Sequence, residues 1–284
     1  MSIQWFPGHM AKTRRMITDN LKLIDVVVEL ADARLPESSR NPLLSELIGQ
    51  KPRVLVLTKA DLAQRELTNQ WLMYYKQQGI PAIALNLTRS TKNNRKEFLD
   101  LVRGQAREIL EKRAKKGIIN KTVRTMIIGI PNVGKSTLIN MVAGRGAAET
   151  GNRPGVTRGK QWIRLENDVE LLDTPGMLWP KIEDPEVGRK LAATGAVSDN
   201  TFDQEELAIW LLEWLQKNLS GRINERYKVP EEGSGFELLE VISRKRGFLR
   251  SGGIVDPVQG AIMLLDEFRA GKLGYITLDR DIDL

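Results

Sequence analysis

A phosphate-binding motif stands near the middle of the chain. The stretch Gly129-Ile130-Pro131-Asn132-Val133-Gly134-Lys135-Ser136 matches the pattern G-x-x-x-x-G-K-[ST]. Glycines in such a loop let backbone N–H groups surround phosphates, and the helix that follows adds partial positive charge at its N-terminus. Lys135 would then reach the β- and γ-phosphates, and the Ser136 hydroxyl would bind Mg²⁺. An apolar run precedes the motif and a helical pattern follows it, which disfavours a chance glycine-rich turn.

Two later segments suit the γ-phosphate end of a bound triphosphate. Asp173 follows the apolar run 169–172, where its carboxylate can hold Mg²⁺, and the Gly176 N–H can face the γ-phosphate. Thr157 lies in the loop 153–158, and we expect it to be a second Mg²⁺ ligand, ordered only when the γ-phosphate is present. Each of these tetrapeptides is weak evidence alone. Their order and spacing behind the phosphate loop predict a Mg²⁺-dependent triphosphate site.

A base-reading element comes earlier, where Thr58-Lys59-Ala60-Asp61 closes the apolar run 53–57. The Asp61 carboxylate can accept hydrogen bonds from N1–H and the 2-amino group of guanine, a pair of donors that adenine lacks. The stem of Lys59 can cover the face of the base. Thr58 stands where such elements usually carry Asn. Alone, this tetrapeptide is more often a helix cap after a strand, but beside a phosphate loop it predicts guanine binding.

The order of these segments is unusual, because the base reader precedes the phosphate loop and the Thr157 and Asp173 loops follow it. This order resembles that of the circularly permuted GTPases. Three more segments resemble the YlqF-type branch of those GTPases, namely Trp5–Met10, Asp32–Pro36 and Gly252–Asp256. The resemblance covers the whole chain. It implies a GTP-hydrolysing switch that acts in late assembly of the large ribosomal subunit, with subunit precursors and ribosomal RNA as partners.

The resemblance also implies further site residues. The stretch Asn86-Leu87-Thr88 matches the segment that contacts guanine O6 through its backbone, although it departs from the common S-A-K wording. The nucleotide-binding set that we expect is Thr58, Lys59, Asp61, Asn86, Leu87, Thr88, Asn132, Val133, Gly134, Lys135, Ser136, Thr137 and Gly176.

Water activation needs another group, because Ras-like enzymes place a Gln after the Asp-x-x-Gly loop and this chain has Met177 and Leu178 instead. Besides Lys135, His9 is the intrinsic catalytic candidate, since a histidine can orient water near neutral pH. We expect it to reach the γ-phosphate when the protein meets the ribosome. A surface or RNA-contacting histidine is the equally weighted alternative.

Asn132 suggests a second ion. In GTPases activated by a monovalent cation, an asparagine at this position of the phosphate loop binds K⁺ beside the β- and γ-phosphates, where an arginine finger would otherwise put its charge. We therefore expect K⁺ to accelerate hydrolysis. The alternative is that Asn132 only stabilises the turn of its loop.

Strands and helices alternate over the first part of the chain, which predicts a mostly parallel α/β sheet. The expected strands are 24–30, 53–58, 81–87, 125–130, 161–165 and 169–172, and the expected helices are 10–23, 97–116 and 135–142. After about residue 180 only helical patterns follow, at 205–219, 236–243 and 258–270. We therefore predict a phosphate-loop GTPase sheet over 1–180 and a small all-α domain over 181–284 that contacts RNA or the ribosome.

Composition excludes several classes of protein. The 284 residues include no cysteine and one histidine, so disulfides, cysteine-bound metals and histidine-rich metal sites are excluded. Without a long apolar run or a leader peptide, we expect a cytoplasmic protein that does not enter membranes. Separately, we expect a monomer.

The formal charge of +7 is concentrated in the first 200 residues, above all in the basic stripe 89–124. Three sets of basic residues are candidates to bind RNA backbone: this stripe, the residues Lys12, Arg14 and Arg15, and the group Arg244–Arg246 with Arg250. Trp5 and Phe6 could stack on a base or anchor the N-terminus in the core. A solvated helix face is the alternative for the stripe.

Two other functions remain open. The chain could be a nucleotide-dependent protein-binding module whose GTP hydrolysis is incidental. An ATP-dependent kinase would share the phosphate loop but would leave Asp61 and Thr157 without a role.

Overall fold

The computed structural model describes residues 7–89, 91–119, 121–143, 162–166, 168–178 and 182–282, with only the backbone for 7–11. The described chain forms two compact units. One contains the residues up to 178 together with 277–282, and the other contains residues 182–276. The C-terminal segment 277–282 thus belongs with the sheet, whereas the sequence places it in the helical domain.

A six-stranded sheet forms the centre of the first unit. Its strands are β1 (Val26–Asp32), β2 (Arg53–Thr58), β3 (Ala82–Leu85), β4 (Val123–Gly129), β5 (Trp162–Glu166) and β6 (Val169–Leu172), in the order β3-β2-β1-β4-β6-β5. Neighbouring strands are parallel except β5, which runs antiparallel to β6. Every residue of β1 is buried, as expected for a parallel strand with helices on both faces.

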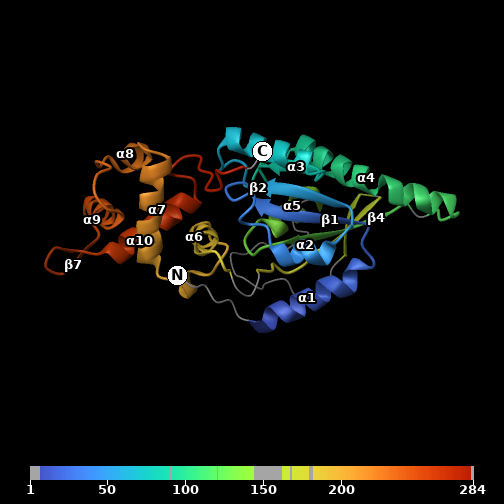
Figure 1. Cartoon of the computed structure of the whole chain (residues 1–284), viewed down its shortest axis with the longest axis horizontal. Helices are drawn as coiled ribbons and strands as arrows, with labels where there is room; N and C mark the ends of the chain where they lie inside the picture. Colours follow the sequence, from blue (N-terminus) through green and yellow to red (C-terminus); the bar gives the residue numbers. More distant parts are fainter. Residues whose placement is uncertain are drawn as a thin grey trace. The chain divides into compact units, whose positions relative to one another are not determined.

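Helices cover the sheet on both faces, and Figure 1 shows the sheet between α4 and α2. The helices of this unit are α1 (Pro7–Leu21), α2 (Pro42–Ile48), α3 (Arg65–Gln77), α4 (Lys92–Lys115) and α5 (Lys135–Ala143). The sequence analysis did not predict α2 or α3. The signal for α2 is local, because Asn41 caps its N-terminus by accepting a hydrogen bond from Leu43 N and Pro42 takes the first helical position.

The second unit is mainly helical. It contains α6 (Pro185–Ala193), a 3-10 turn at Asp199–Thr201, α7 (Gln204–Asn218), α8 (Arg222–Tyr227), α9 (Gly235–Lys245) and α10 (Pro257–Arg269). Leu211, Trp214 and Leu215 of α7 are buried, as their helical spacing predicts. The unit also carries a short hairpin of β7 (Leu249–Arg250) and β8 (Ile254–Val255), which the sequence does not predict.

The C-terminal segment joins the sheet unit through specific hydrogen bonds. Asp279 accepts bonds from Glu37 N at 3.0 Å and from Ser38 N at 2.7 Å, and its own carbonyl accepts one from Trp71 Nε1 at 3.1 Å. Gln64 N donates to Thr277 Oγ1 at 3.0 Å. These bonds pair buried and partly buried polar groups of the sheet unit, and they help to hold the returning chain there.

Among the residues that the structure describes, no helix combines the length and the hydropathy that a membrane span requires.

Candidate functional site

Four of the predicted segments follow strands that end at one edge of the sheet. The base reader follows β2, Asn86 follows β3, the phosphate loop follows β4 and Asp173 follows β6. Because these strands are parallel neighbours, their carboxyl ends lie along the same edge. Ligands of open α/β sheets bind at that edge.

The phosphate loop connects β4 to α5, which begins at Lys135. Asn132 has φ 56° and Gly134 has φ 105°, so the loop turns through left-handed backbone at two positions. Asparagine tolerates this conformation better than most residues, and glycine adopts it without strain. The buried Lys135 ammonium donates to the carbonyl of Gly129 at 3.3 Å and to that of Ile130 at 2.6 Å.

Lys135 and Asp173 perturb each other. Burial lowers the pKa of Lys135 to about 8, an effect that Asp173 opposes and the nearby Lys59 cation strengthens. Burial likewise raises the pKa of Asp173, although Lys135 pulls it back down. Both groups are therefore costly to keep charged here, and the negative phosphates and the metal of a bound nucleotide would stabilise their charged forms.

The residues present suit Mg²⁺. Asp173 Oδ1 is buried and has no hydrogen-bond partner among the described residues, so a hard oxygen ligand is available where the motif requires one. Ser136 is half-buried at the start of α5. Thr157, the third expected ligand, lies outside the described residues. Within the described part of the chain, no group of three or more acidic or histidine side chains offers an alternative metal site.

Gly176 brings the Asp173 loop against the phosphate loop. A Cβ on Gly176 would stand 2.8 Å from backbone atoms of Pro131 and 2.9 Å from Lys135 Nζ. Only glycine permits this approach. Met177 N then donates to Gly129 O at 3.0 Å, which fixes the two loops together.

Thr58 joins the base reader to the phosphate loop. Its buried hydroxyl lies 2.6 Å from the carbonyl of Val133 and 3.1 Å from that of Ala31, and it can donate to either. Threonine stands where such elements usually carry Asn, and its hydroxyl connects the base reader to the phosphate loop. Asp61 is half-buried and makes no hydrogen bond or ion pair with the described residues, which leaves its carboxylate available for a ligand.

The segment after β3 lies close to the same loop. Asn86 Oδ1 accepts from Thr88 N at 2.9 Å and from Thr88 Oγ1 at 2.7 Å, which folds residues 86–88 into a tight turn. Leu87 is buried, and its Cδ1 atom lies 3.3 Å from where a Cβ on Gly134 would stand. Thr137 is half-buried in the first turn of α5. The structure thus places one expected residue of each neighbouring segment, Thr58, Leu87 and Gly176, against the phosphate loop. That these residues bind a nucleotide stays a prediction.

Met177 and Leu178 are buried, and Met177 belongs to an apolar cluster with α1 and α2. Asn41 Nδ2 donates to the Met177 carbonyl at 2.9 Å. These positions serve the core rather than water activation. His9 lies in the first turn of α1, but its side chain is outside the described part of the structure, so its catalytic role stays a prediction.

The structure adds Asp32 to the site, a residue that the sequence analysis noted only in the resemblance. Its carboxylate lies 2.9 Å from Lys59 Nζ. An Asp at the end of the strand next to the base reader is the sequence signal that could have indicated its contact with Lys59.

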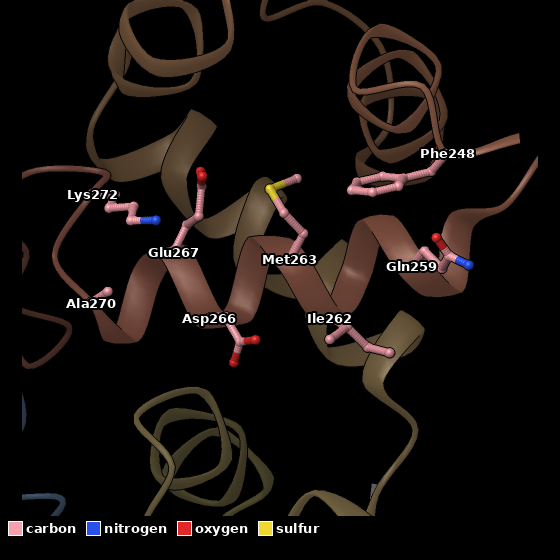
Figure 2. A pocket seen from close by; sticks show the side chains of 8 residues that line it. All are labelled: Phe248, Gln259, Ile262, Met263, Asp266, Glu267, Ala270 and Lys272. Carbon is pink, nitrogen blue, oxygen red and sulfur yellow. The ribbon is translucent and has the colours of Figure 1, made fainter.

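A separate pocket of about 520 Å³ lies on α10 in the helical unit. Figure 2 shows Met263 extending from α10 toward the Phe248 ring, while Asp266 points away on another side of the helix. None of the phosphate- or base-reading residues lines this pocket.

Comparisons with known proteins show the family of the chain. Residues 124–229 match the model of the family described as 50S ribosome-binding GTPase. The chain is 48% identical over 280 residues to ribosome biogenesis GTPase A of Bacillus cereus, covering 98% of this chain and 94% of the relative. It is 30% identical over 282 residues to ribosome biogenesis GTPase A of Thermotoga maritima, covering 99% and 96%. It is also 35% identical over 304 residues to mitochondrial ribosome-associated GTPase 1 of Mus musculus, covering 98% and 90%.

Solved structures give the same result. The fold is similar to GDP-bound YlqF with a TM-score of 0.69 and 28% identity, over 94% of this chain and 99% of that one. A GNP-bound YlqF from T. maritima gives a TM-score of 0.67 and 28% identity, over 95% and 100%. Given these identities over nearly the full length, the chain is a GTPase and belongs to the ribosome biogenesis GTPase A family.

Proposed function

We propose that this GTPase is a switch in late assembly of the large ribosomal subunit, and that it contacts ribosomal RNA. The observation that carries this proposal is the meeting of the four nucleotide loops in a chain that spans relatives named for ribosome biogenesis. The Thr157 and Asp173 loops would become ordered when the γ-phosphate is bound and disordered after it is released. A bound ribosomal particle would thereby respond to the nucleotide state.

Each loop has a distinct task in the proposed mechanism. Asp61 reads the edge of guanine, and Lys135 binds the β- and γ-phosphates. Ser136, Asp173 and Thr157 would hold Mg²⁺, which neutralises the negative charge that these phosphates carry during hydrolysis. The N–H of Gly176 faces the γ-phosphate.

Exposed cations on the sheet unit support contact with RNA. Lys12, Arg14 and Arg15 are exposed on α1. At the end of α4, Lys115 and Lys116 are exposed and form no ion pair with the described residues. Such surface cations bind phosphate backbones without reading sequence.

Other members of the basic stripe are already engaged within the protein. Arg103 pairs with Glu166 and Asp168, and Arg113 pairs with Asp25. These arginines help to hold α4 to the sheet unit. The end of α4 is therefore the better RNA candidate than the stripe as a whole.

The basic group of the helical unit is also partly engaged. Arg250 pairs with Asp256 at 2.9 Å, and Arg246 lies 3.8 Å from Glu267 and over the ring of Tyr227. This arrangement favours the sheet unit as the main RNA-binding surface.

The decisive experiment measures GTP hydrolysis with and without purified large subunits and their precursors, together with co-sedimentation in GDP and in a non-hydrolysable GTP analogue. We expect stimulated hydrolysis and tighter binding with the GTP analogue. Binding without any stimulation would favour the nucleotide-dependent binding module. No binding in either nucleotide state would contradict the proposal.

The RNA contact has its own test. Lys115→Ala/Lys116→Ala should weaken binding to large subunits several-fold and reduce the dependence of affinity on salt. The matched control is Arg65→Ala/Lys76→Ala, which removes two exposed cations from α3 in the same unit. Equal binding by both double variants, or a flat salt response in the wild type, would indicate protein contacts instead.

A further inference from the structure

The side chain of Lys59 is held by the neighbouring strand. Asp32 ends β1 and lies opposite Thr58, the last residue of β2. Lys59 follows in left-handed backbone, with φ 55°. Its ammonium then lies 2.9 Å from Asp32 Oδ2. Strained backbone of this kind in a non-glycine residue is concentrated at functional sites.

The Asp32 carboxylate is itself rigidly fixed. Oδ1 accepts from the backbone N and from Nε of Arg34, each at 3.0 Å, and Oδ2 accepts from Arg34 Nη2 at 2.7 Å. Asp32 N donates to Ser39 Oγ at 2.8 Å. Asp32 and Arg34 are each only 2% exposed. A two-point contact of this type fixes orientation as well as distance.

Two neighbouring cations keep the Asp32 carboxylate ionised. Burial raises the pKa of Asp32, but the Arg34 and Lys59 cations outweigh it and hold that pKa well below its usual range. Asp32 therefore stays negative at every physiological pH. Loss of its charge would leave two cations facing each other in a buried space.

We propose that Asp32, oriented by Arg34, is a positioning residue for guanine-nucleotide binding, because it fixes Lys59 so that the lysine stem covers the face of the base. The proposal rests on the base-binding role proposed for Lys59 and Asp61. Asp32 does not touch the nucleotide and acts through Lys59.

The two roles have different consequences for selectivity. Lys59 covers the ring face, which guanine and hypoxanthine share. Asp61 reads the ring edge, where hypoxanthine lacks the 2-amino group. Loss of Asp32 should therefore weaken the binding of GDP and of IDP by the same factor. Loss of Asp61 should weaken the binding of GDP more than that of IDP.

The experiment is a double-mutant cycle on the full chain, with the dissociation constants of GDP and IDP measured by calorimetry. We expect Asp32→Asn to weaken both nucleotides about tenfold in the wild-type background and less than twofold in a Lys59→Met background. Arg34→Lys is a second variant, expected to weaken binding two- to threefold, again only when Lys59 is present.

Asp25→Asn is the matched control. Asp25 is a buried aspartate just before β1, at the opposite end of the strand, and it pairs with Arg113 at 2.5 Å. We expect it to lower stability without changing GDP affinity. Urea unfolding of every variant separates loss of fold from loss of binding.

Two results would overturn the proposal: an Asp32→Asn effect that persists unchanged in the Lys59→Met background, or a changed ratio of GDP to IDP affinity in Asp32→Asn. Unchanged GDP affinity in Lys59→Met would also overturn it. In that last case Asp61→Ala tests separately whether Asp61 recognises guanine. Its effect on the ratio of GDP affinity to IDP affinity does not depend on Asp32.

Discussion

The Asp61 carboxylate combines partial burial with the absence of any partner among the described residues. A carboxylate in that state can accept both guanine donors without first breaking an internal bond. Selectivity then follows from the cost of leaving a polar group unpaired in the site, which is larger than the net gain of making the bond.

Asp61→Asn should therefore exchange base preference. The amide offers a donor where guanine also presents a donor, so GDP affinity should fall on the order of a hundredfold, while xanthosine diphosphate should gain affinity. Competition against a fluorescent guanine nucleotide measures both effects. Glu46→Gln, which neutralises an exposed acid on α2, is the control, and the same preference in both variants would contradict the assignment.

Asn132 permits a similar test for the cation. We expect hydrolysis to be about tenfold faster in KCl than in NaCl at equal ionic strength, because K⁺ adds positive charge beside the phosphates. Asn132→Gly should remove the difference while keeping the left-handed backbone at this position. Equal rates in the two salts would argue against a K⁺ site.

His9 is the third single-residue test. Since Met177 and Leu178 are buried and have no group that can accept or donate a proton, another group must orient the attacking water. His9→Ala should leave GDP affinity unchanged and lower ribosome-stimulated hydrolysis about a hundredfold, the usual size of a general-base effect. Unchanged stimulated turnover would remove His9 from the mechanism.

Individual elements were predictable where apolar runs are continuous. The strands β2 and β6 occur at the expected residues 53–58 and 169–172. The expectation for β1 was 24–30, whereas the strand covers 26–32. Buried Asp32 ends the strand two residues later than expected, with its charge neutralised by Arg34.

The helices of the second unit depend on another buried acid. Glu267 of α10 accepts two bonds from Arg226 of α8, at 2.9 and 2.5 Å, and one from the Tyr227 hydroxyl at 3.0 Å. The hydrogen bonds from Arg226 lower the pKa of Glu267 despite its burial. The charged form of Glu267 is therefore a source of stability for α8 and α10.

Glu267→Gln should destabilise the protein by about 2 kcal/mol at neutral pH, because charge-assisted bonds are lost from a buried position. A lowered carboxyl pKa contributes stability above the unfolded value of 4.5, and that stability is lost as pH falls through the folded pKa. The difference between wild type and variant should therefore shrink below about pH 4.5. Urea unfolding at pH 7 and pH 4 measures it, with the exposed Glu232→Gln as control. A difference independent of pH would contradict the charge argument.

For the molecule as a whole, the sequence predicted the α/β sheet and the helices that follow it. It also proposed the site residues, because each motif is a short stretch with its own chemistry. It did not predict connections between distant stretches. The bond from Thr58 to the Val133 carbonyl and the pair of Lys59 with Asp32 depend on strand order rather than on sequence neighbours. Thr157 lies outside the described residues, and its role stays a prediction.

The C-terminal segment is the longest of these connections. The chain leaves the sheet unit before residue 182, forms the helical unit and returns to the sheet unit at Thr277. Gln64, three residues after Asp61, donates to Thr277 and accepts from Arg280 Nη1 at 2.9 Å. The returning segment thus supports the residues directly behind the base reader.

Asp279→Ala should loosen this support. The buried carboxylate accepts from Glu37 N, Ser38 N and Ser38 Oγ, so the alanine would leave partly buried donors without this partner, at a cost of about 1 kcal/mol. We expect a lower urea midpoint and faster proteolytic cleavage after residue 276. Asp281→Ala is the matched control, because Asp281 is exposed two residues further along the same segment. If both variants unfold at the wild-type urea midpoint, the segment does not stabilise the sheet unit. Its contacts with Gln64 would then not support the residues behind Asp61.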